Sequence, residues 1–187
     1  EEIDQIVINT DARKKLASHG LRDSERIIIR DRPNSICGDD ISMNLILSDD
    51  IQNINADIFL MTHTTNPLLS ADTIRKALKT FIDSHPSQKV DSLFSVNRFQ
   101  TRFYSKDGSA INHDPSLLVK TQDLEPWYEE NSNLYLFTPA SFMSTQSRIG
   151  KHPILFVTPK SESFDIDGTE DWELAHWIAK GKSQSEI

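Results

Sequence analysis

The sequence predicts an α/β domain, with helices on both faces of a mostly parallel sheet. Short apolar runs that are typical of buried strands occur at residues 5–9, 26–30, 57–62, 91–96, 134–137 and 154–157. Segments with apolar residues at helical spacing lie between most of these runs, and this alternation is typical of parallel strands joined by crossover helices. The length of 187 residues fits a single domain.

Local signals place the helices between these strands. A short helix is expected to begin near Thr10 and to end at Gly20, because glycine readily adopts the left-handed conformation of a helix end. A second helix is expected from about Ser42. The clearest helix follows Ser70, a favourable N-cap, and carries one apolar stripe as far as Ser84.

The second half of the chain is less regular. Residues 97–131 mix aromatic, amide and acidic side chains without a helical pattern, which predicts a hairpin and a long irregular excursion. A short helix is expected near residues 139–144 and another over about residues 169–179. The remaining residues, 181–187, have the composition of a polar tail.

Composition excludes several classes of protein. The formal net charge of −8 argues against a nucleic-acid partner, so a nucleotide substrate needs a metal or a few placed basic groups. No apolar run approaches 18 residues and no signal-peptide pattern is present, so we expect no membrane segment. Cys37 is the only cysteine, which excludes an internal disulfide and agrees with a reducing cytoplasm.

A pair of carboxylates near the C-terminus is the strongest chemical signal. On an extended segment, Asp165 and Asp167 point to the same side and Ile166 points to the other, toward the core. Two adjacent carboxylates repel each other, and Mg²⁺ relieves this repulsion while leaving coordination positions for phosphate oxygens. The alternative is that Asp167 only caps the following helix, with Glu170 reaching back from three positions on.

Three polar segments fall at or just after the ends of predicted strands: the turn 62–67, the loop 32–42 and the acidic pair. Ligands of open α/β sheets bind at the carboxyl ends of the strands. We therefore expect these segments to share one crevice.

An ordered set of short sequence motifs along the chain resembles the motifs of the acylneuraminate (nonulosonate) cytidylyltransferase family, the CMP-sialic acid synthetases. The resemblance runs from about Ile6 to Ala179, and any one motif alone is weak. The motifs are Phe-Leu-Met-Thr-His-Thr-Thr-Asn-Pro-Leu at 59–68, Asp-Ser-Leu-Phe-Ser-Val at 91–96, Glu-Glu-Asn-Ser-Asn-Leu-Tyr at 129–135, Arg-Ile-Gly at 148–150, and Asp165-Ile166-Asp167 followed by Asp171.

The resemblance implies a Rossmann-like nucleotidyltransferase that uses CTP, a nine-carbon keto-sugar acid and Mg²⁺. The anomeric hydroxyl of the sugar attacks the α-phosphate, pyrophosphate leaves, and a CMP-sugar forms. The implied site residues are Asp165 and Asp167 at the metal and the reaction centre, Arg32 and Ser42 near the nucleotide, and His63, Thr65, Asn66, Glu130 and Asn131 near the sugar. The resemblance also implies a homodimer, in which residues 97–131 pair two subunits and cover the neighbour's site.

Several of these residues have an alternative interpretation. Arg32 precedes Pro33 and can simply pair with Asp31 or Asp39, while His63 can be an ordinary turn residue. Glu130 and Asn131 can pair across a dimer instead of contacting sugar. Many members of the family carry an arginine near positions 129–130, where this chain has two acids, so the resemblance does not explain how the sugar carboxylate is bound.

The glycines mark a second departure from the family. The family opens with a strand and a glycine- and basic-rich loop around the triphosphate, but the six glycines here are never clustered enough for a phosphate cradle. We expect the sequence to be a fragment that begins at the family's second strand, because losing the first strand would expose an apolar edge at the sheet centre.

Three other functions fit parts of the sequence. A non-catalytic dimeric relative fits the absent loop, and a transferase that activates the eight-carbon sugar acid Kdo fits the general chemistry. The phrase Phe-Asp-Ile-Asp-Gly-Thr at residues 164–169 also resembles the first motif of haloacid-dehalogenase-type phosphatases. That motif normally opens its domain, whereas here it lies near the end of the sequence.

Overall fold

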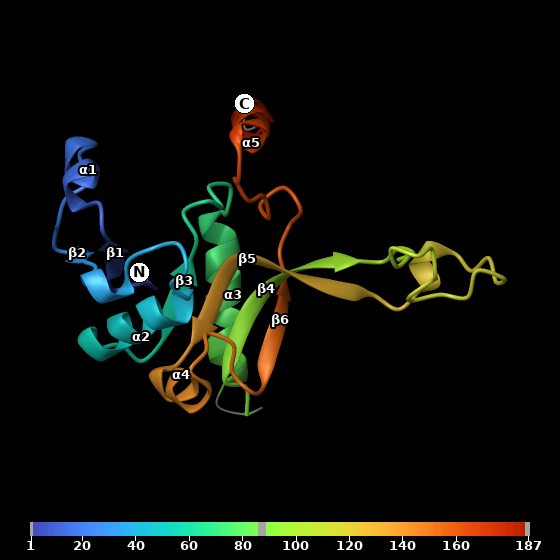
Figure 1. Ribbon diagram of the computed structural model, residues 1–187, viewed down its shortest axis with the longest axis horizontal. Helices are drawn as coiled ribbons and strands as arrows, with labels where there is room; N and C mark the ends of the chain where they lie inside the picture. Colours follow the sequence, from blue (N-terminus) through green and yellow to red (C-terminus); the bar gives the residue numbers. More distant parts are fainter. Residues whose placement is uncertain (1, 86–88, 186–187) are drawn as a thin grey trace. The chain divides into compact units, whose positions relative to one another are not determined.

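The computed structural model of the protein describes residues 2–85 and 89–185 (Figure 1). The chain forms two compact units, which are described one at a time. The first unit comprises Glu1–Phe59 and Phe137–Lys151, and the second comprises Leu60–Leu136 and His152–Ile187. The expectation of a single domain over residues 1–187 stays a prediction.

The first unit is built on a parallel pair of strands. β1 (Ile6–Thr10) and β2 (Ile27–Asp31) pair in register, with Ile6 opposite Ile27, and the short helix α1 (Arg13–Ser18) connects them. Ile29 of β2 is buried. The order strand, helix, parallel strand is the crossover unit that the sequence predicts.

Two further helices complete the first unit. α2 (Met43–Asn53) follows the 3₁₀ turn η1 (Asn34–Ile36) and buries Ile46 and Leu47. α4 (Pro139–Thr145) begins after Thr138, whose hydroxyl accepts from the backbone N–H of Ser141 at 3.1 Å. The fully buried ring of Phe137 packs against Phe59, with 5.9 Å between ring centroids, and against Phe142 at 5.6 Å.

The second unit contains a four-stranded sheet in the order β3-β5-β4-β6. These strands are β3 (Phe59–Thr62), β4 (Ser92–Phe99), β5 (Trp127–Phe137) and β6 (Pro153–Val157). β4 and β6 are parallel, with Ser92 opposite Pro153. The helix α3 (Ala71–Ser84) lies against the sheet, and its buried Ala77 and Phe81 form a core with Leu93 and Leu134 (Figure 1).

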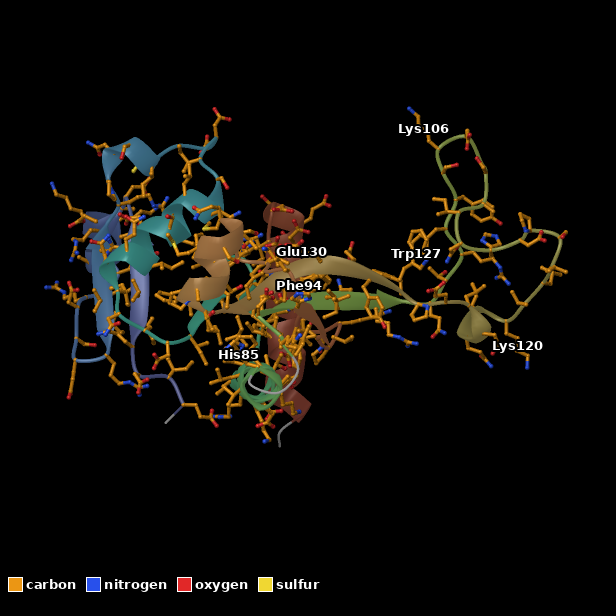
Figure 2. All side chains as sticks on the ribbon, turned by 90° about the horizontal axis from the view of Figure 1, so that it is seen from below. His85, Phe94, Lys106, Lys120, Trp127 and Glu130 are labelled. Carbon is orange, nitrogen blue, oxygen red and sulfur yellow. The ribbon has the colours of Figure 1, made fainter. Side chains whose placement is uncertain are left out.

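Between β4 and β5 the chain leaves the sheet as a long excursion over residues 100–126 (Figures 1 and 2). Its regular structure is one antiparallel bridge between Tyr104 and Ala110 and a 3₁₀ turn, η2 (Thr121–Asp123). Figure 2 shows Lys106 and Lys120 in this segment and Trp127 where the chain returns to the sheet. The hairpin-like excursion expected over residues 97–131 is therefore present with slightly different bounds.

The mixed α/β fold with parallel strand pairs is confirmed, while several boundaries differ from the predictions, most of all the start of β5 and the end of α5. β5 begins at Trp127 instead of residue 134, because its outer half is exposed and lacks an apolar pattern. α5 (Thr169–Ser185) continues through most of the predicted polar tail, because polar residues form helix well and Gly181 costs only about 1 kcal/mol. Residues 186–187 of that tail lie outside the described residues.

In the part of the chain that the structure describes, no helix is both long and apolar enough to cross a membrane.

Candidate active site

The acidic segment lies beside the turn that follows β3. Residues 163–167 have no regular secondary structure, and the backbone N–H of Ile166 donates to the carbonyl oxygen of Thr65 at 2.9 Å. The amide nitrogen of Asn66 donates to the carbonyl oxygen of Phe164 at 3.3 Å. These two bonds, together with the half-buried Ile166, hold the segment against the turn 63–67. The turn and the acidic segment are therefore neighbours, while a crevice that they share stays a prediction.

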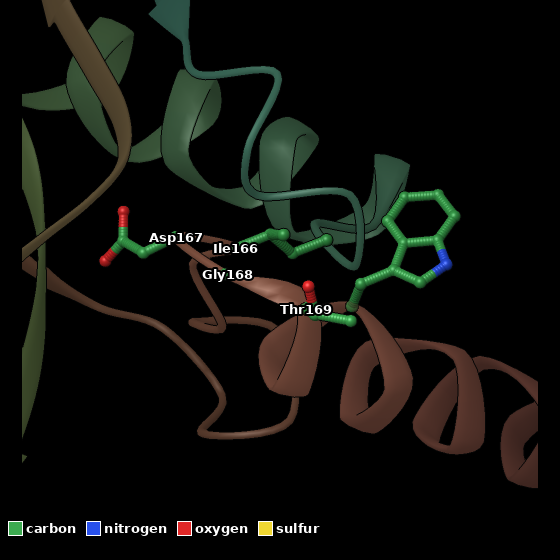
Figure 3. Close-up of a pocket in the computed structure, with 5 residues that line it drawn as sticks. Ile166, Asp167, Gly168 and Thr169 are labelled. Atoms are coloured by element: carbon green, nitrogen blue, oxygen red, sulfur yellow. The ribbon is translucent and has the colours of Figure 1, made fainter.

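The carboxylates of Asp165 and Asp167 are exposed, and neither has a hydrogen bond or ion pair with the described residues. Figure 3 shows the Asp167 carboxylate pointing away from Ile166. Both residues line a shallow pocket together with Gly168, Thr169 and Trp172. Two acids are thus presented to solvent on a segment whose backbone is fixed.

The helix start that follows is stabilised by a different acid from the one considered in the sequence. The carboxylate of Asp171, in the first turn of α5, accepts from the backbone N–H of Asp167 at 3.1 Å and of Gly168 at 2.9 Å. The alternative that Asp167 caps this helix with help from Glu170 is therefore wrong for this structure. Asp171 satisfies these donors, and the Asp167 carboxylate remains available for a ligand.

The structure links two of the predicted sugar-binding residues, His63 and Glu130. The ring of His63 meets the buried ring of Tyr135 edge-on, with 6.4 Å between centroids. The Tyr135 hydroxyl donates to the Glu130 carboxylate and approaches the Ser132 hydroxyl at 3.2 Å. Ser132, within β5 and two residues after Glu130, has a φ of +57°, a conformation that few non-glycine residues adopt. Tyr135 therefore joins the turn after β3 to the middle of β5.

Asn131 lies in a buried polar network. Its amide nitrogen donates to Asn97 Oδ1 at 3.0 Å and to Thr158 Oγ1 at 2.7 Å. Its amide oxygen accepts from the backbone N–H of Asn133 at 3.3 Å. Both kinds of polar group on this side chain are thus used to join β4, β5 and the residue after β6. This geometry gives Asn131 a structural role within the chain, while its contact with the sugar and its pairing across a dimer both stay predictions.

Two residues to which the sequence gave no role position the acidic segment. Glu162 is buried, and its carboxylate accepts from the backbone N–H of Ser70, the N-cap of α3, at 2.9 Å. Its carbonyl oxygen accepts from the amide of the fully buried Asn133 at 3.0 Å. From the sequence, Glu162 lies in a polar stretch and is expected at the surface. Its role in holding the start of α3 is visible only from its contact with Ser70, which is distant in the sequence.

The acidic segment is compatible with a hard cation whose remaining coordination positions are filled by a substrate. Among the described residues, no group of three His, Cys, Asp or Glu side chains forms a metal cage. Mg²⁺ normally takes one or two carboxylates and fills its octahedron with water and phosphate oxygens. The neighbouring Asn66 is buried, and its amide oxygen has no hydrogen-bond partner in the described structure. The segment thus offers two exposed carboxylates, whereas the unpartnered oxygen of Asn66 is itself buried.

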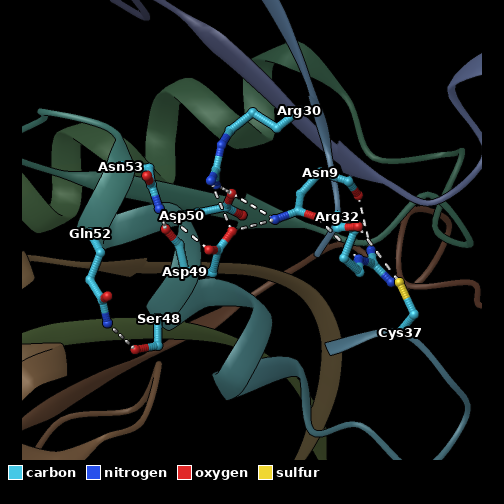
Figure 4. Close-up of polar contacts among 9 residues, drawn as sticks. All are labelled: Asn9, Arg30, Arg32, Cys37, Ser48, Asp49, Asp50, Gln52 and Asn53. Carbon is cyan, nitrogen blue, oxygen red and sulfur yellow. Dashed lines mark hydrogen bonds and ion pairs between the residues drawn. The ribbon is translucent and has the colours of Figure 1, made fainter. Parts of the chain in front are cut away.

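Arg32 and Ser42 lie in the first unit. The Arg32 guanidinium donates to the side chain and the backbone of Asn9, and not to Asp31 or Asp39 (Figure 4). Asp31 instead accepts from Arg13 at 2.9 Å. Ser42 is the N-cap of α2, and its hydroxyl accepts from the backbone N–H of Asn44 at 3.3 Å. Because the acidic segment belongs to the second unit, a crevice shared with Arg32 stays a prediction.

Comparison with known proteins gives curated relatives at low identity, while no family model matches. The chain is 25% identical over 140 residues to a pseudaminic acid cytidylyltransferase of Campylobacter jejuni, covering 72% of this chain. It is 22% identical over 140 residues to the post-translational flagellin modification protein B of Campylobacter coli, covering 74% of this chain. The matches span 59% and 60% of these relatives, less than two thirds of their length.

Solved structures share the fold. The 4-diphosphocytidyl-2C-methyl-D-erythritol synthase of Anaerococcus prevotii superposes with a TM-score of 0.68 at 10% identity, covering 96% of this chain and 80% of that one. The 2-C-methyl-D-erythritol 4-phosphate cytidylyltransferase of Francisella tularensis superposes with a TM-score of 0.60 at 11% identity, covering 94% and 80%. The resemblance to the nonulosonate cytidylyltransferases is thus confirmed by curated relatives at low identity, on the nucleotidyltransferase type of fold that the sequence predicts.

Proposed function

We propose that the protein is a cytidylyltransferase that transfers CMP from CTP to the anomeric hydroxyl of a nonulosonic acid. The observation that carries the proposal is the acidic segment bonded to the turn 63–67, because it places two unpaired carboxylates beside the predicted sugar site. The relatives named pseudaminic acid cytidylyltransferase support this substrate class and make pseudaminic acid the first sugar to test.

In the proposed reaction, the anomeric oxygen forms a bond to the α-phosphorus of CTP as the bond to pyrophosphate breaks. The hydroxyl proton passes to solvent water, and pyrophosphate leaves with the electron pair of the broken bond. Asp165 and Asp167 would hold Mg²⁺, which supplies neutralisation of phosphate charge when bound. The chain's own contribution is positioning: His63, Thr65, Asn66 and Glu130 orient the sugar, and Arg32 and Ser42 orient the nucleotide.

The proposal includes a homodimer in the cytoplasm. The excursion carries Leu117, Leu118 and Val119 on its surface, and Leu118 is 91% exposed. A run of exposed apolar side chains on a projecting segment favours contact with a second subunit. Sedimentation equilibrium at micromolar concentration should give twice the monomer mass, and a monomer would contradict this part of the proposal.

Pyrophosphate release tests the reaction. The protein is incubated with CTP and either pseudaminic acid, a sialic acid or Kdo, with and without Mg²⁺, after its intact mass has been verified. We expect Mg²⁺-dependent pyrophosphate release with a nonulosonic acid and much less with Kdo, the control of related chemistry. No CTP binding and no pyrophosphate release by a verified full-length protein would support a non-catalytic relative instead.

A further inference from the structure

A polar network in the first unit surrounds Arg32 (Figure 4). Asn9 lies in β1 and Arg32 follows β2, and the backbone N–H of Arg32 donates to the carbonyl oxygen of Thr10 at 2.8 Å. From this position, Arg32 Nε donates to Asn9 Oδ1 at 3.1 Å and Nη2 donates to the carbonyl oxygen of Asn9 at 2.9 Å. Asn9 therefore accepts from two donors on one edge of the guanidinium.

Two aspartates of α2 determine which way the Asn9 amide faces. Asn9 Nδ2 donates to Asp50 Oδ1 at 2.8 Å and approaches Asp49 Oδ2 at 3.4 Å. With its NH₂ group against these carboxylates, the amide turns its oxygen toward Arg32. The flipped amide would place its oxygen against two acids and its NH₂ group against a guanidinium, so both contacts would be repulsive.

Arg30 holds the two aspartates in place. Its guanidinium lies 2.9 Å from Asp49 Oδ2 and also forms an ion pair with Asp50. The side chains of Arg30, Asp49 and Asp50 are only 16%, 21% and 13% exposed. Burial raises the pKa of Asp50, whereas the bonds from Asn9 and Arg30 act in the opposite direction. Hydrogen bonds between partly buried polar groups are stronger than those between exposed groups, so the two aspartates hold the Asn9 amide firmly in one orientation.

The arrangement leaves part of the Arg32 fork available. A guanidinium has five N–H donors in one plane, and the two bonds to Asn9 fix that plane. In the described parts of the chain, the other donors of Arg32 have no partner. A fixed cationic fork loses less conformational freedom on binding than a free arginine, which is the usual benefit of preorganisation.

We propose that Asn9 is a positioning residue, which holds the Arg32 guanidinium in one orientation for the oxygen acceptors of a cytidine nucleotide and is itself oriented by Asp49 and Asp50. The assignment of the nucleotide rests on the proposed function. The positioning of Arg32 by Asn9 rests only on the bonds within the first unit.

A double-mutant cycle tests whether Asn9 acts through Arg32. CTP binding is measured by calorimetry for the full chain and for Asn9→Ala, Arg32→Ala and the double variant. We expect each single change to weaken CTP binding about 10-fold, because each removes a charge-assisted interaction. In the Arg32→Ala background, the Asn9 change should have almost no further effect. Asp31→Asn is the matched control, because Asp31 adjoins Arg32 in sequence but pairs with Arg13.

A second measurement separates the positioning of Arg32 from nucleotide binding. The ¹⁵N relaxation of the Arg32 Nε–H group reports its order in the absence of CTP. We expect a rigid signal in the wild type and in Asp31→Asn, and a mobile one in Asn9→Ala. If Asn9→Ala does not fold, Asn9→Ser replaces it, since a serine hydroxyl is too short to bridge Arg32 and the aspartates.

The outcomes are distinct. Order that is unchanged in the Asn9 variant, or additive effects on CTP binding in the double variant, would overturn the positioning role. Loss of order combined with no CTP binding by the wild type would support positioning by Asn9 but overturn both the nucleotide assignment and the proposed function.

Discussion

The segment around Arg32 and the segment around Asp165 are both predicted to bind charged substrate groups, yet they are built in opposite ways. Around Arg32, side chains bond to side chains: Asn9, Arg30, Asp49 and Asp50 form a network of low exposure. Around Asp165 and Asp167, backbone groups make the contacts, and the carboxylates themselves remain exposed without partners in the described structure. The cationic group is supported before any ligand arrives, while the acids are left for the ligand.

This difference has a physical reason. The guanidinium of an arginine is always charged, but it sits at the end of a flexible side chain. Holding the side chain in place therefore reduces the conformational entropy that is lost when a ligand binds. Two carboxylates that await a divalent cation must keep their oxygen lone pairs free, so protein donors on them would compete with the metal. Changes in the first segment should therefore affect stability, and changes in the second should affect activity alone.

Asp167→Asn should give the largest effect and no loss of stability. Replacing one of two metal-binding carboxylates should lower turnover by at least about 100-fold, more than the usual loss for an outer-shell change. The thermal midpoint should stay the same, because this exposed carboxylate has no partner in the described structure. Pyrophosphate release is measured as a function of Mg²⁺, with Glu170→Gln as the matched control. Full turnover at limiting Mg²⁺ would contradict the metal role.

Arg30→Met should give the opposite result, a large loss of stability. It leaves two largely buried carboxylates without their cation, which typically costs about 3 kcal/mol at neutral pH. The loss should shrink on acidification. Arg30 lowers the pKa of Asp50, so without Arg30 burial raises this pKa further, and the folded variant gains more from taking up a proton than the folded wild type does. Urea unfolding between pH 7 and pH 5 measures both effects.

The control for this change is Lys79→Met, which removes an exposed ion pair with Asp83 and should leave stability almost unchanged. If Arg30→Met and the wild type had equal free energies of unfolding, the network around Asn9 would contribute little to stability.

Asn131→Ala should give a smaller loss of stability, and it decides between the two interpretations of this residue. The change removes the bonds that Asn131 makes to Asn97 Oδ1, to Thr158 Oγ1 and to the backbone N–H of Asn133, for a loss of about 2 kcal/mol. Urea unfolding at neutral pH gives this value, and the exposed Asn53→Ala serves as the control. Normal stability with weaker sugar binding would instead favour direct contact with the sugar.

The parts of the fold that local patterns determine were predictable from the sequence. Ser70 and the apolar stripe after it placed α3 correctly, because a cap and a periodicity are visible within a few residues. The acidic segment was found for the same reason, since Asp165 and Asp167 are two positions apart. The outer half of β5 was missed, because its exposed residues carry no apolar alternation.

The contacts that hold the candidate site were not predictable, because they join distant residues. Asn9 meets Asp50 across 41 positions, and Glu162 meets Ser70 across 92. No composition or spacing rule selects such partners, and Glu162 resembles an ordinary surface acid until the start of α3 is placed beside it. The same holds for the Asp171 carboxylate, which has a capping role that the sequence analysis gave to its neighbours.

The bond between Asn66 and the carbonyl of Phe164 closes a loop of 98 residues. Contacts that close such long loops form slowly, because the chain loses conformational entropy before the contact contributes any stabilising free energy. During synthesis, the turn 63–67 is made well before the acidic segment that docks onto it. The proposed metal site is therefore complete only after this long-range contact has formed.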